Sequence, residues 1–380
     1  MFLSRLFSRK EKIVIVVDIG SASASVSIVA LRKYGPSKVL SSHRVALAME
    51  DRLPDHAAQA MGRAITEASQ KSLASPIAHE APQDVFAIVR APWTSSTSER
   101  VTQIFPAETR ITDEVIAGMA KAALAQARNL DTQNLLEAKV IRMELDGYQT
   151  QKPAGKHARG VSVSALLTTI QPSIRESCER ALSVASPAHK IKFRSHTRAL
   201  LMIASQTENY ADAIIIDMGS EGTGITSVKK GVVSSVELDV GTHSILLTIG
   251  SGPPEETLTL MRMLEDEKCD TDACKALSAA LGKAEPELTR KFGDSFVQLG
   301  KNGHLQNDLL LLVHPDMAPW LARFLERIDF SQFTITTQPF IAHILSSQDM
   351  WRYVRAETGV SVDTSAAVAI AHVHIEELLD

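Results

Sequence analysis

The same order of strands and turn occurs twice in this chain, about 200 residues apart. Residues 13–50 open with an apolar run that ends in Asp-Ile-Gly-Ser at 18–21, and two further strand-like runs follow. Residues 213–240 repeat this order, with an apolar run that ends in Asp-Met-Gly-Ser at 217–220. Apolar and alternating runs separated by turn residues predict strands. An internal duplication of this kind predicts an α/β protein built from two similar halves.

The other elements are predicted from periodicity, caps and turn residues. Helices are expected at 55–73, after Thr112, at 172–183, at 197–205, over much of 242–300 and in the tail from 366. Strands are expected from Asp84, near 100–105, at 138–148, as a central strand at 161–169 and at 309–315. The predicted domains are a basic N-terminal segment (1–11), a first domain (12–83 with 161–208), an inserted small α+β subdomain (84–160) and a second domain (209–380).

The composition excludes several classes of protein. Hydrophobic residues make up 44% of the chain and charged residues 22%, as in ordinary globular proteins. The net charge of −4 gives no basic field that would indicate nucleic-acid binding. No apolar run reaches the roughly 20 residues of a membrane span, and the longest early run is too short for a signal peptide. The predicted location is therefore the cytoplasm.

The cysteines and histidines form no metal-binding pattern. Three cysteines are too few for a disulfide framework, so Cys269 and Cys274 are expected to be free thiols rather than metal ligands. His372 and His374 diverge by about 200° on a helix and are expected to be surface or partly buried structural residues. We predict no protein-dedicated metal site and no catalytic residue from these spacings.

The first ten residues combine apolar and basic side chains in helical spacing. The predicted membrane-contacting residues are Phe2, Leu3, Arg5, Leu6, Phe7, Arg9 and Lys10. A short helix with this pattern is suited to an anionic membrane surface. The alternative is a frayed N-terminus, which is common in proteins of any class.

The two repeated loops are suited to holding phosphate groups. A strand-turn-strand loop rich in small residues exposes backbone N–H groups to anions, and a carboxylate at the strand end can hold hydrated Mg²⁺. The candidate nucleotide-binding residues are Asp18, Gly20, Ser21 and Ser23 in the first loop and Asp217, Gly219, Ser220, Gly222 and Thr223 in the second. The alternative role of Asp18 and Asp217 is to close a tight turn with their own side chains.

The order of these motifs over about residues 12–265 resembles the FtsA/PilM branch of the actin-like ATPase superfamily. The segments at 16–31 and 214–245 resemble the two phosphate loops of that branch, and the second includes Gly241 after its hairpin. Residues 110–124 resemble a helix of the small inserted subdomain of this branch, and residues 145–169 resemble the segment that leads back from it. The resemblance implies a duplicated, ribonuclease H-like two-domain fold with the insertion in the first domain, and ATP with Mg²⁺ as the expected cofactors.

The sequence departs from this family at the phosphate and adenosine motifs. Ser25 stands where the first loop often has a lysine, and the second loop has Ser220, Glu221 and Gly224 in place of two glycines and an aspartate. A carboxylate at Glu221 would repel phosphate oxygens. His314 and Pro315 replace the glycine pair of the adenosine loop, and proline has no N–H. These changes predict a degenerate nucleotide cleft and no efficient ATPase activity, with an ATP-binding switch as the alternative.

The resemblance implies a cytoplasmic scaffold that is peripheral at the inner membrane. The preferred role is PilM-like type IV pilus assembly, with the cytoplasmic tail of an inner-membrane assembly protein as partner and no nucleic acid. The alternative is an FtsA-like cell-division protein that binds ATP, self-associates into filaments and tethers a tubulin-like division protein. The acidic C-terminal sequence and the basic N-terminal segment favour the pilus role. The inserted-subdomain segments look closer to FtsA.

Overall fold

The computed structural model describes residues 11–75, 81–127, 130–186, 189–206, 212–229, 232–250, 252–301, 305–330 and 338–379. The predicted membrane-contacting residues 2–10 lie outside this part of the chain. Two compact units are present, and each is described by itself. The first unit comprises residues 1–89, 172–199 and 346–380, and the second comprises residues 90–171 and 200–345.

A six-stranded sheet forms the centre of the first unit, in the order β15-β3-β2-β1-β4-β9. Its strands are β1 (Lys12–Ile19), β2 (Ser23–Leu31), β3 (Ser37–Ala46), β4 (Asp84–Val89), β9 (Ile191–Ser195) and β15 (Val354–Ala356). The strands β1, β2 and β3 are antiparallel, whereas β4 and β9 continue the sheet in parallel. All residues of β1 from Ile13 to Ile19 are buried, so both faces of the sheet must be covered.

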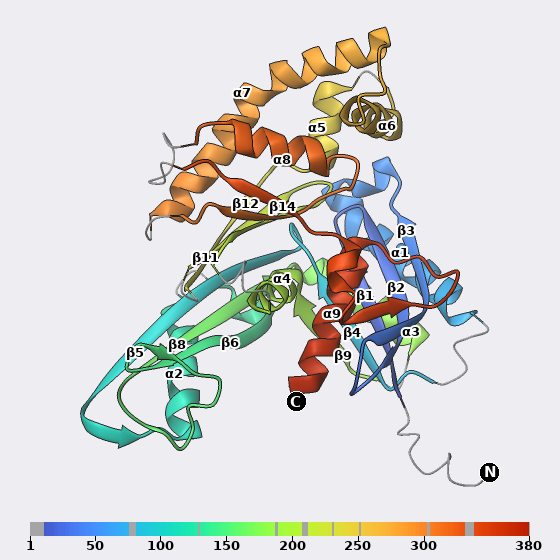
Figure 1. The fold of residues 1–380 in the computed structure, drawn as a ribbon. Helices are drawn as coiled ribbons and strands as arrows, with labels where there is room; N and C mark the ends of the chain where they lie inside the picture. The colour runs from blue at the N-terminus through green and yellow to red at the C-terminus, as the bar shows by residue number, and fades with distance from the viewer. Residues whose placement is uncertain are drawn as a thin grey trace. The chain divides into compact units, whose positions relative to one another are not determined.

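Helices from distant parts of the chain cover this sheet. They are α1 (Pro54–Leu73), α3 (Pro172–Ala185) and α9 (Thr364–Leu379), with the short 3₁₀ turns η1 (Met49–Arg52) and η4 (Ser347–Met350). The helix α1 packs on β2, β3 and α3, whereas α9, red in Figure 1, packs on β1 and β2. The last residues of the chain thus complete the core of the first unit. The helix α4 (His196–Ser205) begins in this unit.

The second unit repeats the arrangement of the first in a five-stranded sheet, in the order β12-β11-β10-β13-β14. Its strands are β10 (Ile214–Met218), β11 (Thr223–Lys229), β12 (Val232–Leu238), β13 (Asp308–Leu312) and β14 (Ile341–Ile344). The first three are again antiparallel and the last two parallel. Asp18 lies opposite Ser25 in the first sheet, and Asp217 lies opposite Gly224 at the same place in the second. The predicted duplication and α/β fold class are confirmed.

Four helices gather on one side of this sheet and enclose an aromatic core (Figure 1). They are α5 (Thr242–Ile249), α6 (Pro254–Glu265), α7 (Asp272–Gly300) and α8 (Ala318–Arg327). The rings of Phe296 and Phe330 meet edge to face at 5.1 Å between centroids, and Trp320 stacks on Phe324 at 5.6 Å. The Phe292 ring of α7 also lies 6.2 Å from the Phe324 ring of α8. This contact helps to hold the two helices together, since aromatic pairs contribute beyond the area they bury.

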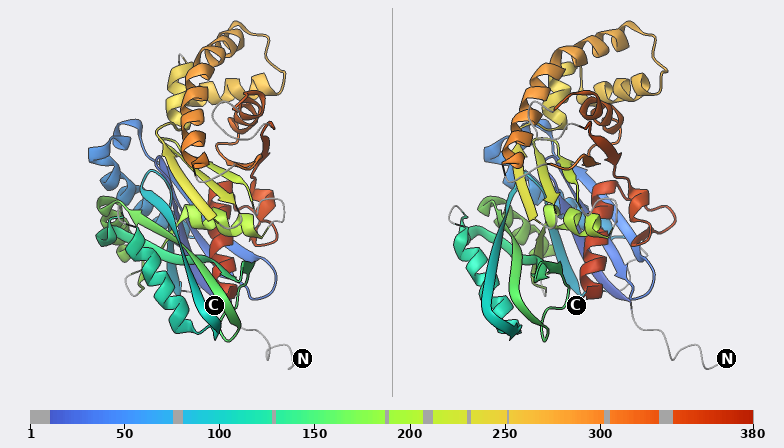
Figure 2. Two further views of the ribbon diagram at one scale, coloured as in Figure 1. Left: turned by 90° about the vertical axis from the view of Figure 1, so that its left-hand side faces the viewer. Right: turned by 60° about the vertical axis from the view of Figure 1, so that its left-hand side comes forward.

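A small sheet with its own helix belongs to the second unit. Its order is β5-β8-β6-β7, with β5 (Thr94–Arg110), β6 (Leu135–Leu145), β7 (Tyr148–Gln149) and β8 (His157–Ile170), and η2 (Thr132–Asn134) precedes β6. The helix α2 (Asp113–Gln126) packs on β5 and β8, as both views of Figure 2 show. The Thr112 hydroxyl accepts a hydrogen bond from the Val115 amide and caps α2, as the sequence predicts.

The observed units differ from the predicted domains. Residues 90–160, predicted as an insertion in the first domain, belong to the second unit, and so do residues 200–208. Residues 84–89, predicted to open the insertion, form β4 inside the first sheet. The predicted central strand at 161–169, placed in the first domain, is part of β8 in the small sheet, because β8 keeps pairing with β5 up to Ile170 and with β6 up to Thr169. Residues 346–380, predicted in the second domain, belong to the first unit, since β15 pairs with β3 and α9 packs on β1.

The cysteine prediction is wrong in one respect. Cys269 and Cys274 form a disulfide with their Cα atoms 6.0 Å apart, whereas free thiols were expected. Thr271, between them, begins α7 by accepting a hydrogen bond from the Cys274 amide, and this turn brings the two sulfurs together. Cys178 is a free thiol on α3, and burial, with a smaller contribution from Glu179, raises its pKa to about 12.

Among the described residues, no helix is both long enough and apolar enough to cross a bilayer.

Candidate functional site

The first predicted phosphate loop is a tight turn between β1 and β2. The Gly20 amide donates to the Ser23 carbonyl at 3.0 Å and closes the turn. The Leu47 amide donates to the Ala22 carbonyl at 2.8 Å, which fixes the outer side of the loop. Ser21 is buried at 2% exposure. The loop is therefore held largely by its own backbone and by the end of β3.

Asp18 is bound to an arginine that the sequence interpretation missed. Its side chain is 1% exposed, and its Oδ2 accepts from Arg44 Nη2 at 2.6 Å and from Ser365 Oγ at 2.8 Å. Asp18 pairs with Ser25 on β2, and Ser25 pairs with Arg44 on β3, so the three residues form one row across the sheet. Because Ser25 is small, the long Arg44 side chain can reach over it to the carboxylate.

Arg44 also binds groups on both sides of the loop. Its Nε and Nη2 donate to the two oxygens of Asp363 at 2.7 and 3.0 Å, and its Nη1 donates to Ser23 Oγ at 2.8 Å. Burial disfavours its charge, but the carboxylates of Asp18 and Asp363 outweigh this effect and raise the pKa of Arg44 above its ordinary value. Arg44 therefore stays charged and neutralises Asp18.

The second predicted phosphate loop is a similar tight turn between β10 and β11. The Gly219 amide donates to the Gly222 carbonyl at 2.8 Å, and the Thr223 hydroxyl donates to the Val240 carbonyl at 2.6 Å. The Ser220 hydroxyl donates to the Glu221 carboxylate at 3.1 Å. The glutamate that departs from the family pattern is therefore part of the loop's own hydrogen bonding.

Asp217 is likewise bound to an arginine, which comes from outside its own sheet. Arg90 follows directly after β4 and forms an ion pair with the Asp217 carboxylate. Both side chains are nearly buried, with 12% and 11% exposed. A Cβ added at Gly224 would touch the Ala91 side chain at 3.9 Å, so the chain after Arg90 lies over the loop. The small residue opposite Asp217 thus leaves room for this segment.

The amide groups at the start of α5 are already hydrogen-bonded. The Thr242 amide donates to the Gly219 carbonyl and the His243 amide to the Ser220 carbonyl, both at 2.9 Å. The Gly241 amide donates to Ser244 Oγ at 3.0 Å. A Cβ at Gly241 would lie 2.1 Å from the Ser220 carbonyl oxygen, so only glycine permits this approach. A helix N-terminus binds anions through amides that have no partner in the helix. At α5, carbonyl groups of the loop accept these hydrogen bonds in place of an anion.

With these arginine contacts in place, the aspartates of the two loops are not suited to holding Mg²⁺ and a nucleotide. Mg²⁺ is held by carboxylate oxygens and water, and an arginine within hydrogen-bond distance repels a cation and competes for those oxygens. Among the described residues, no group of three or more His, Cys, Asp or Glu could hold a metal ion. At the predicted adenosine position, the His314 carbonyl accepts from the amides of Met317 and Ala318 and so begins the turn into α8.

Comparisons with known proteins show a match in structure without one in sequence. No family model matches the chain, and no curated protein does. A solved structure described as a PilM-PilN type IV pilus biogenesis complex superposes with a TM-score of 0.58 at 12% identity, over 96% of this chain and 98% of that one. The chain has the actin-like ATPase fold. A Bacteroides thetaiotaomicron protein described as having an actin-like ATPase fold and unknown function matches with a TM-score of 0.36 at 9% identity, over 96% and 97%.

Within this actin-like fold, each predicted loop is assembled as the sequence indicated. Asp18, Gly20, Ser21 and Ser23 lie together at the end of the first hairpin. The other candidates lie together at the end of the second, and these are Asp217, Gly219, Ser220, Gly222, Thr223 and Gly241. The sequence interpretation missed the two arginines, although the sequence shows Arg90 directly after an apolar strand and Arg44 within a predicted strand.

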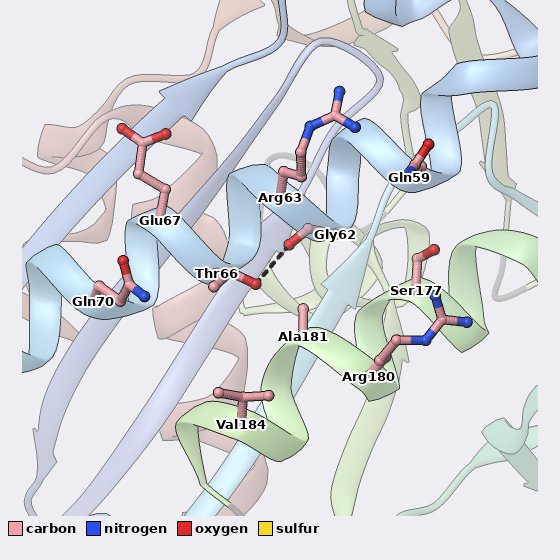
Figure 3. Close-up of a pocket in the computed structure, with 10 residues that line it drawn as sticks. All are labelled: Gln59, Gly62, Arg63, Thr66, Glu67, Gln70, Ser177, Arg180, Ala181 and Val184. Carbon is pink, nitrogen blue, oxygen red and sulfur yellow. Dashed lines mark hydrogen bonds between the residues drawn. The ribbon is translucent and has the colours of Figure 1, made fainter.

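A groove on the first unit lies apart from these loops. It has a volume of about 430 Å³ between α1 and α3 (Figure 3). Small residues lie where the helices approach, since a Cβ at Gly62 would be 3.6 Å from the Ser177 Cβ. Polar side chains line the two sides, namely Gln59, Arg63, Thr66, Glu67, Gln70 and Arg180. None of the predicted nucleotide-binding residues lines this groove.

The two late histidines are buried, which corrects the expectation that they are surface or partly buried residues. His372 is 0% and His374 4% exposed. His372 Nε2 lies 3.6 Å from Glu376 Oε2, and Arg194 and Arg198 bind the same carboxylate at 2.9 and 3.0 Å. This cluster joins α9 to β9 and α4. Burial first, and then Arg198, lowers the pKa of His372 to about 3.

We expect the stability of the first unit to fall as pH drops below about 6.5 because of His372. The unfolded chain binds a proton at this residue near that pH, whereas the folded chain does so only near about 3. The unfolded state therefore holds one more proton in this window, and acid favours it. Urea denaturation between about pH 7 and pH 5 should show His372→Phe losing less stability than the wild type. The exposed residue His56 provides the control: His56→Phe should keep the wild-type slope, and equal slopes for all three proteins would contradict this assignment.

Proposed function

We propose that the protein is an actin-like scaffold of the PilM kind in type IV pilus assembly. In this proposal it binds the cytoplasmic segment of a PilN-like protein of the inner membrane and lies peripherally at that membrane. The support is the match to the PilM-PilN complex, which extends over 96% of this chain and 98% of the other. The basic and apolar N-terminal segment would add a tether to the membrane surface.

The observation that carries the scaffold role is the pair of arginine contacts at the two phosphate loops. Arg44 binds Asp18 in the first unit, and Arg90 binds Asp217 in the second. An actin-like protein that works as a nucleotide switch needs these loops to accept a charged ligand and its metal. Loops closed by internal ion pairs instead favour a protein whose function lies on its surfaces. We propose that the nucleotide cleft is degenerate for this reason.

The test is binding of the cytoplasmic segment of the PilN-like protein from the same cell, measured by calorimetry with and without millimolar Mg²⁺-ATP. We expect binding with an affinity that ATP does not change. Equilibrium dialysis should show no ATP binding in the micromolar range by the wild type. It should show none by Glu221→Gly either, because that variant retains both arginine contacts.

Each result bears on a separate part of the proposal. No binding of the segment would contradict the PilM-like role. Micromolar ATP binding by the wild type would contradict the degenerate cleft and favour an ATP-dependent switch. ATP binding by Glu221→Gly alone would mean that the glutamate, and not the arginines, excludes the nucleotide.

A further inference from the structure

One edge of the first unit exposes aromatic rings together with basic groups. Tyr34 in the turn between β2 and β3 is 80% exposed, and Trp351 in the turn before β15 is 49% exposed. Lys33, Arg352 and Arg355 are exposed beside them in sequence. We call these five residues the aromatic edge. Large aromatic side chains are usually buried. Two exposed ones among basic residues therefore indicate a binding surface.

The turn that carries Tyr34 and the turn that carries Trp351 both lie beside Ser37. Ser37 begins β3 directly after the Tyr34 turn, and its amide donates to the Tyr353 carbonyl at 2.8 Å. Ser37 also pairs with Val354 at the start of β15. Gly35, with φ of 78°, allows the sharp turn that exposes Tyr34. The two turns are therefore neighbours at the same end of the sheet.

Strand β1 begins at this same end of the sheet. Lys12 pairs with Leu31, and Leu31 is three residues before Tyr34. In the strand order, β1 and β15 are separated by β2 and β3, which places them about 14 Å apart at the usual strand spacing of about 4.8 Å. The start of β1 at Lys12 therefore lies close to the aromatic edge.

Several acidic residues at this end of the sheet are paired with groups outside the aromatic edge. Glu11 pairs with Arg32, Glu357 with Lys38 and Glu377 with Lys12, and Asp349 accepts hydrogen bonds from Ser346. The Arg355 guanidinium lies over the Trp351 ring at 4.8 Å, and that of Arg352 lies over Tyr353 at 4.6 Å. These cation–π contacts hold the aromatic and basic groups together in a fixed arrangement.

We propose that the aromatic edge is a second contact of this protein with an anionic lipid bilayer. Tryptophan and tyrosine favour the level of the lipid headgroups, where an amphipathic ring meets both apolar chains and water. Each nearby lysine or arginine adds attraction to anionic lipid. A single short amphipathic segment binds weakly, and a second contact on the folded unit strengthens membrane association and fixes the orientation of that unit. The inference rests on the proposed membrane location and is independent of the PilN-like partner.

The aromatic edge contains a built-in spectroscopic probe. Of the three tryptophans, Trp93 and Trp320 are buried at 8% and 6% exposure, so Trp351 is the one that a lipid can reach. We would mix the full chain with vesicles of phosphatidylglycerol and brominated phosphatidylcholine, because bromine quenches tryptophan fluorescence at short range. We expect a blue shift and quenching with the wild type, and neither with Trp351→Phe.

Sedimentation with the same vesicles separates the aromatic edge from the N-terminal segment. We expect Tyr34→Ser/Trp351→Ser to bind at least about tenfold more weakly than the wild type, as two lost interfacial aromatics imply. A control, Val184→Ser, removes an exposed apolar residue of α3 and should leave binding unchanged. Circular dichroism verifies that each variant is folded.

Two results would overturn the inference. Failure of the wild type to bind anionic vesicles would exclude a membrane contact at this edge. Binding without quenching of Trp351 would assign the contact to residues 2–10 or to another surface. Neither result would affect binding of the PilN-like segment, so failure of this inference can be distinguished from failure of the proposed scaffold role.

Discussion

Gly241→Ala is expected to lower the free energy of unfolding of the second unit by about 3 kcal/mol, at the upper end of the cost of overpacking. The added methyl group would lie 2.1 Å from the Ser220 carbonyl oxygen and 2.7 Å from the Glu221 amide nitrogen. Both atoms are backbone, so no side chain can rotate to make room. The loop and the start of α5 must separate, and the hydrogen bond from Thr242 to Gly219 lengthens or breaks.

Urea denaturation followed by tryptophan fluorescence measures this effect, since Trp93 and Trp320 are buried in the second unit. Gly282→Ala provides a matched control, because Gly282 lies in α7 with nothing within 4 Å of an added Cβ. Alanine is favoured over glycine in a helix, so this control should gain about 0.5–1 kcal/mol. If both variants shift stability in the same direction, the close contact at Gly241 does not exist as described.

Arg44→Met is expected to destabilise the first unit by about 3 kcal/mol, the lower end of the cost of breaking a buried ion pair. The substitution removes the guanidinium that Asp18 contacts at 2.6 Å, while the carboxylate remains 1% exposed. It also removes the donors to Asp363 and Ser23. Part of the arginine side chain is exposed, at 29%, which is why the lower end of the range is expected.

The control for this prediction is Arg32→Met, measured by urea denaturation under the same conditions. Arg32 pairs with Glu11 at 2.8 Å, but both side chains are well exposed, at 37% and 43%. Exposed pairs contribute about 0–1 kcal/mol. A difference of less than about 1 kcal/mol between the two variants would show that Arg44 is not structurally important. In that case Asp18 would be available for a metal ion, and the degenerate cleft would have to be reconsidered.

The duplicated strand pattern made the fold class predictable from the sequence. The apolar runs at 13–19 and 214–218 do form equivalent strands, and their aspartates occupy equivalent positions. Local chemistry was enough here, because hairpins bring together residues that are close in the sequence. For the same reason, the candidate residues of each loop lie together at the end of one hairpin.

The arginine contacts could not be predicted in the same way. The row from Asp18 through Ser25 to Arg44 depends on the register of β2 and β3, which shifts between Ile28 and Val29. An alternation pattern read without that shift places the side chains on the wrong faces. Ser365 and Asp363 lie more than 300 residues from the loop they support. Only the tertiary structure brings such residues together.

The place of the C-terminal helix was also hidden from sequence analysis. Residues 365–376 of α9 are all buried, so the helix shows no polar face that would indicate which sheet it covers. Sequence adjacency assigned it to the second domain. In the structure, Glu376 on this helix forms ion pairs with Arg194 of β9 and Arg198 of α4, and His372 lies in the electrostatic field of both arginines. Buried polar residues in a helix of this kind are the one signal that could have indicated such a partner.

The division of the first unit among three separate stretches of the chain has a consequence for biosynthesis. Strands β1 to β4 precede the second unit in the sequence, whereas β15 and α9 follow it. During synthesis, the face of β1 and β2 that α9 covers therefore stays exposed until the intervening residues have been made. The second unit is complete by residue 345 and can fold during synthesis. The first sheet is thus made before the second unit, and the helix that covers it is made after the second unit.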